Sequence, residues 1–161
     1  MQIRAASAAD WPALWPIVKA AVDAGETYVW RPTPSSEEMR ALWLAPAPWH
    51  ICVAELDGEI VGTAKVGPNR PGRGAHVATA SFIVSPDHQG RGVGRALGEY
   101  IVRWAMDAGY RGMQFNAVVA TNTGAVALWQ SLGFDVIGTV PKAFDHPTQG
   151  LVDLHVMYRT L

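Results

Sequence analysis

Residues 84–97 read VSPDHQGRGVGRAL. Of all parts of the sequence, this stretch indicates the fold most directly. Three glycines alternate through its centre: Gly90, Gly92 and Gly94. Glycines between a strand and a helix permit positive φ and close backbone approach, so that several N–H groups converge on an anion at the positive end of the helix dipole. Arg91 and Arg95 add charge-assisted donors. The stretch therefore predicts a phosphate-binding turn.

Other glycine-rich motifs fit these residues less well. A dinucleotide fingerprint, G-x-G-x-x-G, needs a third glycine where Arg95 or Leu97 stands, and no acidic residue ends a strand about 20 residues further on. A Walker loop is excluded because the chain has no Gly-Lys-Ser/Thr. A plain strand-to-helix turn stays an alternative, although three glycines and two arginines exceed what a turn requires.

The segments around the glycines alternate between strand and helix. Residues 76–84, before the loop, are nearly all apolar or small, which is typical of a central strand. Residues 93–105, after it, have helical spacing, and Gly109 suits the position just past a helix end. The predicted elements that follow are a strand at 113–119, a helix at 122–132 and strands at 134–140 and 151–158.

The first half of the chain predicts two helices and an antiparallel ribbon. Residues 51–56 and 60–66 are strand-like, and Asp-Gly between them is typical of a tight hairpin turn. Pro12 and Pro16 predict a late start or a kink in the first helix. The other elements are a strand at 3–5, a first helix that opens with a capping box at 7–10 and ends near Gly25, a loop at 26–34, a short helix from 35 and a loop at 67–74.

The resulting order of elements is βααβββαβαββ in a single domain of residues 1–161. The second half implies a parallel crossover, whereas the first half is an antiparallel meander. We therefore expect an α/β (α+β) fold with a mixed central sheet and helices on both faces. The functional site should lie where the two halves meet.

The composition excludes several kinds of partner. The chain has 13 Lys and Arg and 14 Asp and Glu. It therefore has no excess of positive charge that would attract nucleic acid or an anionic membrane. No run approaches the roughly 20 apolar residues of a membrane-spanning helix, and the N-terminus lacks a signal-peptide pattern, so we expect a soluble, cytoplasmic protein. The single cysteine, Cys52, lies in an apolar run and predicts a buried thiol. No metal site is predicted.

Residues 84–97 resemble the acetyl-CoA motif of the GCN5-related N-acetyltransferases (the GNAT family), which reads Gln or Arg, two residues, Gly, one residue, Gly or Ala. Gln89, Gly92 and Gly94 occupy these places. A second block is similar to the family's later helix and the strand after it: Asn122, Ala125, Leu128, Trp129 and residues 132–134. The order of elements is also the family's, so the resemblance covers nearly the whole chain.

The resemblance implies that acetyl-CoA binds here, with CoA as the product. Its pantetheine arm would hydrogen-bond the backbone of the strand that ends the first motif: Phe82, Ile83 and Val84. Its pyrophosphate would lie against the loop and the first turn of the helix: Gln89, Gly90, Arg91, Gly92, Val93, Gly94 and Arg95. Asn122 either reaches the cofactor or serves only as a helix N-cap.

Transfer of the acetyl group to an amine requires loss of a proton, because a free amine has a pKa near 10.4. In the family a backbone N–H at the strand end commonly binds the oxyanion, here that of Val84. Many members carry a tyrosine as general acid where this chain has Trp129, and indole is no acid at neutral pH. Trp129 is either a core residue or a wall of the cofactor site.

The general base is less clearly marked. Glu26 lies on the segment that covers the acceptor site in the family, and it acts directly, through water, or is merely solvated. Four other ionisable residues are candidates for the general base: His76, Asp145, His146 and His155. Asp145 and His146 belong to the predicted loop between the last two strands.

Asn116 is a polar residue inside a strand, where a buried amide must find hydrogen-bond partners. The pairs at 115–116, 121–122 and 128–129 resemble the subgroup that acetylates proline analogues such as azetidine-2-carboxylate, in which an asparagine at this position meets the substrate. A second substrate asparagine of that subgroup aligns with Thr79. The predicted acceptor site for a small amine or amino acid is Glu26, Thr27, Tyr28, Thr79 and Asn116, with Val84, Asn116 and Glu26 as catalytic candidates.

Two alternatives stay open. The acceptor could be a herbicide-like amino acid, an antibiotic or a protein N-terminus. In a different class, the chain could be an acetyl-CoA-binding sensor or interaction module with little turnover, since Trp129 replaces the usual acid and no base is obvious. The resemblance also implies a possible homodimer through the terminal strands.

Overall fold

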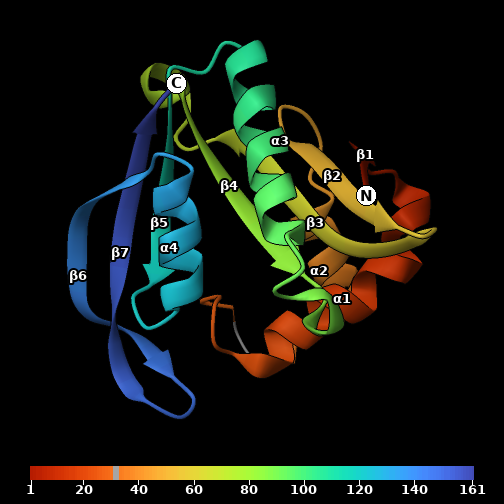
Figure 1. The fold of residues 1–161 in the computed structure, drawn as a ribbon, viewed down its shortest axis with the longest axis horizontal. Coiled ribbons are helices and arrows are strands. Elements are labelled where there is room, and N and C mark those ends of the chain that lie inside the picture. The colour runs from red at the N-terminus through yellow and green to blue at the C-terminus, as the bar shows by residue number, and fades with distance from the viewer. Residues whose placement is uncertain (31–32) are drawn as a thin grey trace.

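The computed structural model describes residues 1–30 and 33–161, so Arg31 and Pro32 of the predicted loop at 26–34 lie outside the described residues. The strands of the described chain form one mixed sheet (Figure 1). They are β1 Gln2–Ala5, β2 His50–Leu56, β3 Glu59–Pro68, β4 Val77–Val84, β5 Gly112–Val119, β6 Asp135–His146 and β7 Gly150–Thr160. The α-helices are α1 Trp11–Ala24, α2 Ser36–Trp43, α3 Val93–Asp107 and α4 Thr123–Ser131. The predicted order βααβββαβαββ is confirmed.

The strands lie in the order β1-β2-β3-β4-β5-β7-β6. The central pair, β4 and β5, is parallel, and the other neighbours are antiparallel. The parallel pair is joined only near its start, where Val77 lies opposite Gly112 and Ala78 opposite Met113. Beyond that point the two strands diverge, as Figure 1 shows. The sheet is therefore split at its centre, between the two halves of the fold.

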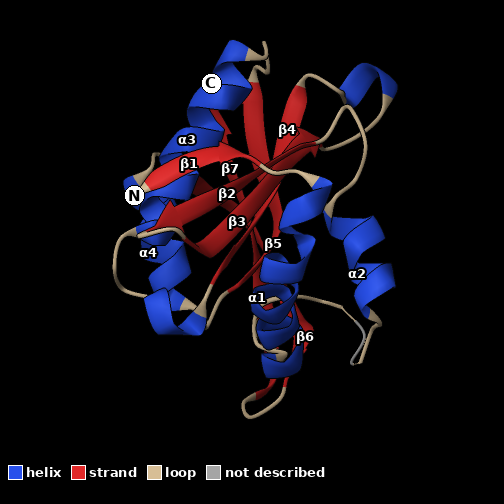
Figure 2. Cartoon of the chain, turned by 90° about the vertical axis from the view of Figure 1, so that its right-hand side faces the viewer, coloured by secondary structure: helices blue, strands red, loops and turns tan. Residues whose placement is uncertain are grey.

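Two hydrophobic cores pack against the two faces of the sheet. Helices α1 and α2 cover one face and α3 and α4 the other (Figure 2). Leu14, Val18 and Trp43 are fully buried on the first face. Leu97 and Ile101 are fully buried on the second. The prediction of helices on both faces is thus confirmed.

The first helix differs from the predicted one in how it begins. A 3-10 turn at Ala8–Asp10, closed by the Ser7–Asp10 capping box, leads directly into α1. Pro12 falls in the first turn, where backbone N–H groups have no partner within the helix. Pro16 lies inside α1, which continues unbroken from Trp11 to Ala24.

Two strands are longer than the sequence indicates. β3 continues through Gly67 and Pro68, which were predicted as loop, because they pair with Thr79 and Ala78 of β4. β6 continues to His146, so that Asp145 and His146 belong to a strand and not to a connecting loop. The register shifts between Val140 and Phe144, where Lys142 adopts a φ of 53°. This irregularity interrupts the alternation that marks a strand in sequence.

Cys52 is fully buried, as predicted, and burial raises the pKa of its thiol to about 12. Among the described residues no helix is long and apolar enough to span a bilayer.

Candidate functional site

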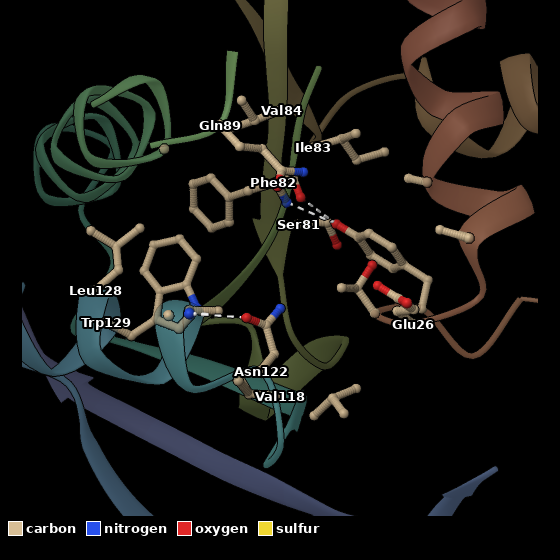
Figure 3. A pocket seen from close by; sticks show the side chains of 18 of the residues that line it. Glu26, Ser81, Phe82, Ile83, Val84, Gln89, Val118, Asn122, Leu128 and Trp129 are labelled. Carbon is tan, nitrogen blue, oxygen red and sulfur yellow. Dashed lines mark hydrogen bonds between the residues drawn. The ribbon is translucent and has the colours of Figure 1, made fainter. Parts of the chain in front are cut away.

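A cavity of about 760 Å³ occupies the divergence between β4 and β5. Its walls come from the end of α1 and the loop after it, from β4 and β5, from the glycine-rich loop and from α4 (Figure 3). The predicted site residues that line it are Glu26, Thr27, Tyr28, Thr79, Phe82, Ile83, Val84, Gln89, Gly90, Gly92, Gly94, Arg95, Asn116 and Asn122. The fold thus brings the predicted donor and acceptor residues to one place.

The backbone of β4 alternates between its two neighbours. The N–H of Ser85 donates to Val61 of β3 at 2.9 Å, and Ile83 lies opposite Thr63 of β3. Because backbone groups of a strand point to opposite sides at successive residues, those of Phe82 and Val84 face the divergence. Ile83 contributes its side chain to the cavity wall, and its backbone faces β3. The expectation that Ile83 hydrogen-bonds a pantetheine arm through its backbone is therefore wrong.

The glycine-rich loop has the geometry that its sequence predicts. Gly90 and Gly92 adopt φ values of 73° and 82°, and Gly92 is the N-cap of α3. The first N–H groups of α3 are thus presented beside the cavity at the positive end of the helix dipole. Apart from the glycine itself and its neighbours along the chain, no atom of the described residues lies within 4 Å of where a Cβ of either glycine would stand. This open, donor-rich turn fits a diphosphate.

The remaining loop residues differ in their relation to the cavity. Arg95 lines it and donates to Ser131 Oγ at 2.9 Å. Arg91 is exposed, and the Val93 side chain is 2% exposed within the core, so neither side chain belongs to the wall. The predicted contribution of Val93 therefore rests on its backbone N–H alone.

Tyr28, from the loop after α1, reaches across to β4. Its hydroxyl donates to the carbonyl oxygen of Phe82 at 2.7 Å, and the Phe82 N–H donates back to the hydroxyl oxygen at 3.0 Å. Figure 3 draws both hydrogen bonds at Phe82. Burial raises the pKa of Tyr28, which keeps the phenol protonated at physiological pH. One side chain thus satisfies both backbone groups that Phe82 turns toward the cavity.

Two residues that sequence alone left ambiguous have structural roles. Asn122 is the N-cap of α4, and its Oδ1 accepts from the N–H of Ala125 at 3.1 Å. Trp129 is 8% exposed and packs on Phe82 and Phe115, with ring centroids 4.6 and 4.9 Å away. Both also line the cavity, so capping and packing do not exclude a contact with the donor.

The acceptor end of the cavity is polar. Glu26, Thr27 and Asn116 are exposed, and Thr79 is partly buried. Asn116 is held in a chain of amides: its Oδ1 accepts from Gln114 at 2.8 Å, and its Nδ2 donates to Asn69 at 2.7 Å. No sequence pattern points to Asn69, because the contact joins residues 47 positions apart.

The other candidate bases do not line the cavity. His76 contacts the carbonyl oxygen of Arg73 at 3.1 Å, and His155 contacts Thr139 at 2.9 Å. His146 is buried beside Thr148. These residues and Asp145 are not among the described residues that line the cavity, and Glu26 is the carboxylate that is. The described residues contain no cluster of three or more His, Cys, Asp or Glu suited to a metal ion.

Ser81 and His88 also line the cavity, although neither was among the predicted site residues. Ser81 follows from the alternation of β4, which places its side chain on the same face as Thr79. His88 Nδ1 is buried with no hydrogen-bond partner in the described structure. Its position in a turn of the motif had no periodicity that could show its burial.

The similarity to known proteins is not limited to the glycine motif but covers most of the chain. The model of the "Acetyltransferase (GNAT) family" matches residues 12–134. A GCN5-related N-acetyltransferase from Kribbella flavida has a TM-score of 0.96 and 55% identity, covering 99% of this chain and 97% of the other. The structure of yncA from Salmonella typhimurium, solved with its cofactor acetyl-CoA, has a TM-score of 0.84 and 28% identity over 100% and 94% of the two chains.

Among characterised sequences, the L-amino acid N-acyltransferase MnaT of Escherichia coli is 32% identical over 88% of this chain and 84% of its own length. Matches to longer proteins are partial, since the chain spans 48% and 16% of the lengths of two yeast relatives that are 35% and 31% identical. The glycine loop, the split sheet and the match across residues 12–134 together establish that this chain belongs to the GNAT family of acetyltransferases.

Proposed function

We propose that this chain transfers the acetyl group of acetyl-CoA to the amine of a small amino acid or other small amine. One observation carries the proposal: a single cavity joins an anion-binding helix N-terminus, the outward-facing backbone of β4 and the polar side chains Glu26, Thr79 and Asn116. A donor and an acceptor that enter from opposite ends of this cavity meet beside β4.

The donor half uses the backbone more than side chains. The amides at the start of α3, with Arg95, hold the diphosphate, and the backbone of Val84 pairs with the pantetheine arm. Acetyl-CoA supplies an acetyl thioester. A backbone N–H that faces the divergence, as that of Val84 does, stabilises the oxyanion that forms on attack.

The acceptor half supplies proton transfer and orientation. Glu26, directly or through water, accepts the proton that the ammonium group must lose. The free amine attacks the thioester carbon, the new N–C bond forms, and the second amine proton passes to solvent. The C–S bond then breaks with its electron pair on sulfur. The thiolate takes its proton from solvent, since a thiol pKa of about 8.5 makes it a fair leaving group and Trp129 has no acidic proton to give.

A small acceptor is favoured by two observations. The relative MnaT is named an L-amino acid N-acyltransferase. Hydrogen bonds with Gln114 and Asn69 hold the Asn116 amide in place at the acceptor end, where it suits a carboxylate or carbonyl group. The resemblance of residues 115–116, 121–122 and 128–129 to the proline-analogue subgroup also supports a small amino acid as the acceptor, so azetidine-2-carboxylate is one of the compounds to test.

The proposal is tested by acceptor-dependent release of CoA thiol. The panel contains common L-amino acids, azetidine-2-carboxylate, a herbicide-like phosphinic amino acid, simple alkylamines and a short peptide with a free N-terminal alanine. We expect turnover with at least one small amino acid and much less with the peptide. Tight acetyl-CoA binding with no acceptor-dependent release would instead establish a binding module and refute the enzyme.

A further inference from the structure

Tyr28 stands across the path that the donor follows along β4. That path begins at the glycine loop, beside the end of the strand, and reaches Val84 before Phe82. The backbone of Val84 faces the divergence, but both backbone groups of Phe82 that face it are bonded to the Tyr28 hydroxyl, at 2.7 and 3.0 Å. A chain that extends past Val84 therefore meets the phenol at the next outward-facing residue.

The phenol is held in place by more than these two hydrogen bonds. Its ring stacks on Trp30, with centroids 4.0 Å apart and an interplanar angle of 2°. Trp30 meets the edge of Trp43, which is fully buried and donates from Nε1 to Thr63 at 3.1 Å. This aromatic ladder connects the loop after α1 to the sheet, so that withdrawing the phenol would disturb several contacts at once.

The opposite side of the path is closed by aromatic rings. The Phe82 side chain points to the α4 face, where it packs on Trp129 and, edge to face, on Phe115. The donor path thus ends between a phenol on one face of the sheet and an indole on the other.

We propose that Tyr28 limits the length of the acyl group that the enzyme transfers. An acetyl group, with one methyl beyond the thioester carbonyl, stops short of the phenol, whereas propionyl, butyryl and longer chains collide with it. This inference rests on the proposed acyl transfer and adds the donor specificity of the same site. The physical cause is steric: the hydroxyl lies within hydrogen-bonding distance of β4 and leaves no gap for a methylene.

The test compares acetyl-, propionyl- and butyryl-CoA with one fixed acceptor. Wild-type protein should lose roughly tenfold or more in kcat/KM for each added methylene, the range seen when a pocket rejects one carbon. Tyr28→Ala should reduce the acetyl-to-butyryl ratio by about tenfold or more. Tyr28→Phe keeps the stacked ring and should retain more of the discrimination than Tyr28→Ala. Because each ratio is taken within one variant, an effect of Tyr28 on the acceptor cancels.

Tyr100→Phe is the matched control. It removes a hydroxyl that hydrogen-bonds His50. Neither residue lines the cavity. Its acyl ratio should equal that of the wild type. Tyr28→Leu serves as a second variant if Tyr28→Ala does not fold, and calorimetric Kd values for the three acyl-CoAs give a readout that needs no acceptor. A folded Tyr28→Ala or Tyr28→Leu with the wild-type ratio overturns the inference. Wild-type protein inactive with every donor and acceptor refutes the proposed function instead.

Discussion

Gly92 has a left-handed backbone and lies at the proposed diphosphate site. It adopts a φ of 82° in open space at the N-terminus of α3. Gly92→Glu should raise the Kd for acetyl-CoA at least about tenfold, because a carboxylate then faces the diphosphate at the helix N-terminus. Calorimetric titration with acetyl-CoA measures this change.

Gly72 provides the matched control for backbone strain. It has a φ of 60° and equally open surroundings, but it lies in the 3-10 turn before β4 and does not line the cavity. Gly72→Glu should lose a similar roughly 1–2 kcal/mol of stability through its left-handed backbone and still bind acetyl-CoA normally. Equal loss of binding in both variants would contradict the placement of the diphosphate.

Asn122 has two candidate roles, as the N-cap of α4 and as a contact to acetyl-CoA. A substitution that changes only its amide nitrogen tests them separately. The Oδ1 caps α4, and Figure 3 shows the amide nitrogen on the side away from the helix. Asn122→Asp keeps the capping oxygen, so its melting temperature should match the wild type. If the Nδ2 donates to the donor molecule, the Kd for acetyl-CoA should rise by about tenfold, the typical cost of a lost hydrogen bond to a buried partner.

Asn122→Ala completes the comparison. It removes the cap as well and should cost about 1 kcal/mol of stability, measured by urea unfolding. An unchanged Kd in Asn122→Asp would mean that Asn122 is an N-cap only.

At the level of elements, α3 and α4 approach each other closely at Gly98. A Cβ at this position would lie 2.6 Å from Leu132 Cδ1 and 3.1 Å from Trp129 Cζ3. Gly98→Val should therefore lower the free energy of unfolding by about 1–3 kcal/mol, even though valine has the better helix propensity. Thermal and urea unfolding measure the loss.

Ala127→Val is the control for this substitution, because Ala127 is exposed on α4. It introduces the same β-branched side chain and should cost only a few tenths of a kcal/mol, roughly its helix propensity. If both variants were equally stable, the helices could not be as close as Gly98 indicates.

The stability of the whole molecule should depend on pH through an ionic network between β1, the turn before α1, and β2. Arg4 contacts Asp10 at 2.7 Å and Glu55 at 2.6 Å. Hydrogen bonds from Arg4 hold the pKa of Asp10 well below its usual value near 3.9. The folded state thus binds this proton less readily than the unfolded state, so the carboxylate stabilises the fold above about pH 4.

Asp10→Asn should lower the free energy of unfolding at pH 7 by about 1–2 kcal/mol. The difference from wild type should shrink as the pH falls below about 4, because the unfolded state then gains its proton first. Urea unfolding between pH 2 and 7, with Asp23→Asn of the exposed Lys19 pair as control, measures this trend. A difference that stays constant with pH would contradict it.

The sequence by itself determined the glycine loop and the order of the elements, and its resemblance to a family motif indicated the donor. The loop and the elements depend on local causes: positive φ requires glycine at residues 90 and 92, and helical or strand periodicity follows from neighbouring residues. Strand ends were less predictable, because pairing with a neighbour extended β3 past residue 66 and β6 past residue 140. Such pairing is not encoded within the strand itself.

Only the tertiary structure decided which polar groups share the cavity. The bond from Tyr28 to Phe82 spans 54 residues, and that from Asn116 to Asn69 spans 47. The divergence of β4 and β5 directs the backbone of Phe82 and Val84, but not that of Ile83, into the site. Glu26 joins the cavity while His76 and His155 lie outside it. Contacts between distant segments depend on how the whole sheet is assembled, which no local pattern of residues specifies.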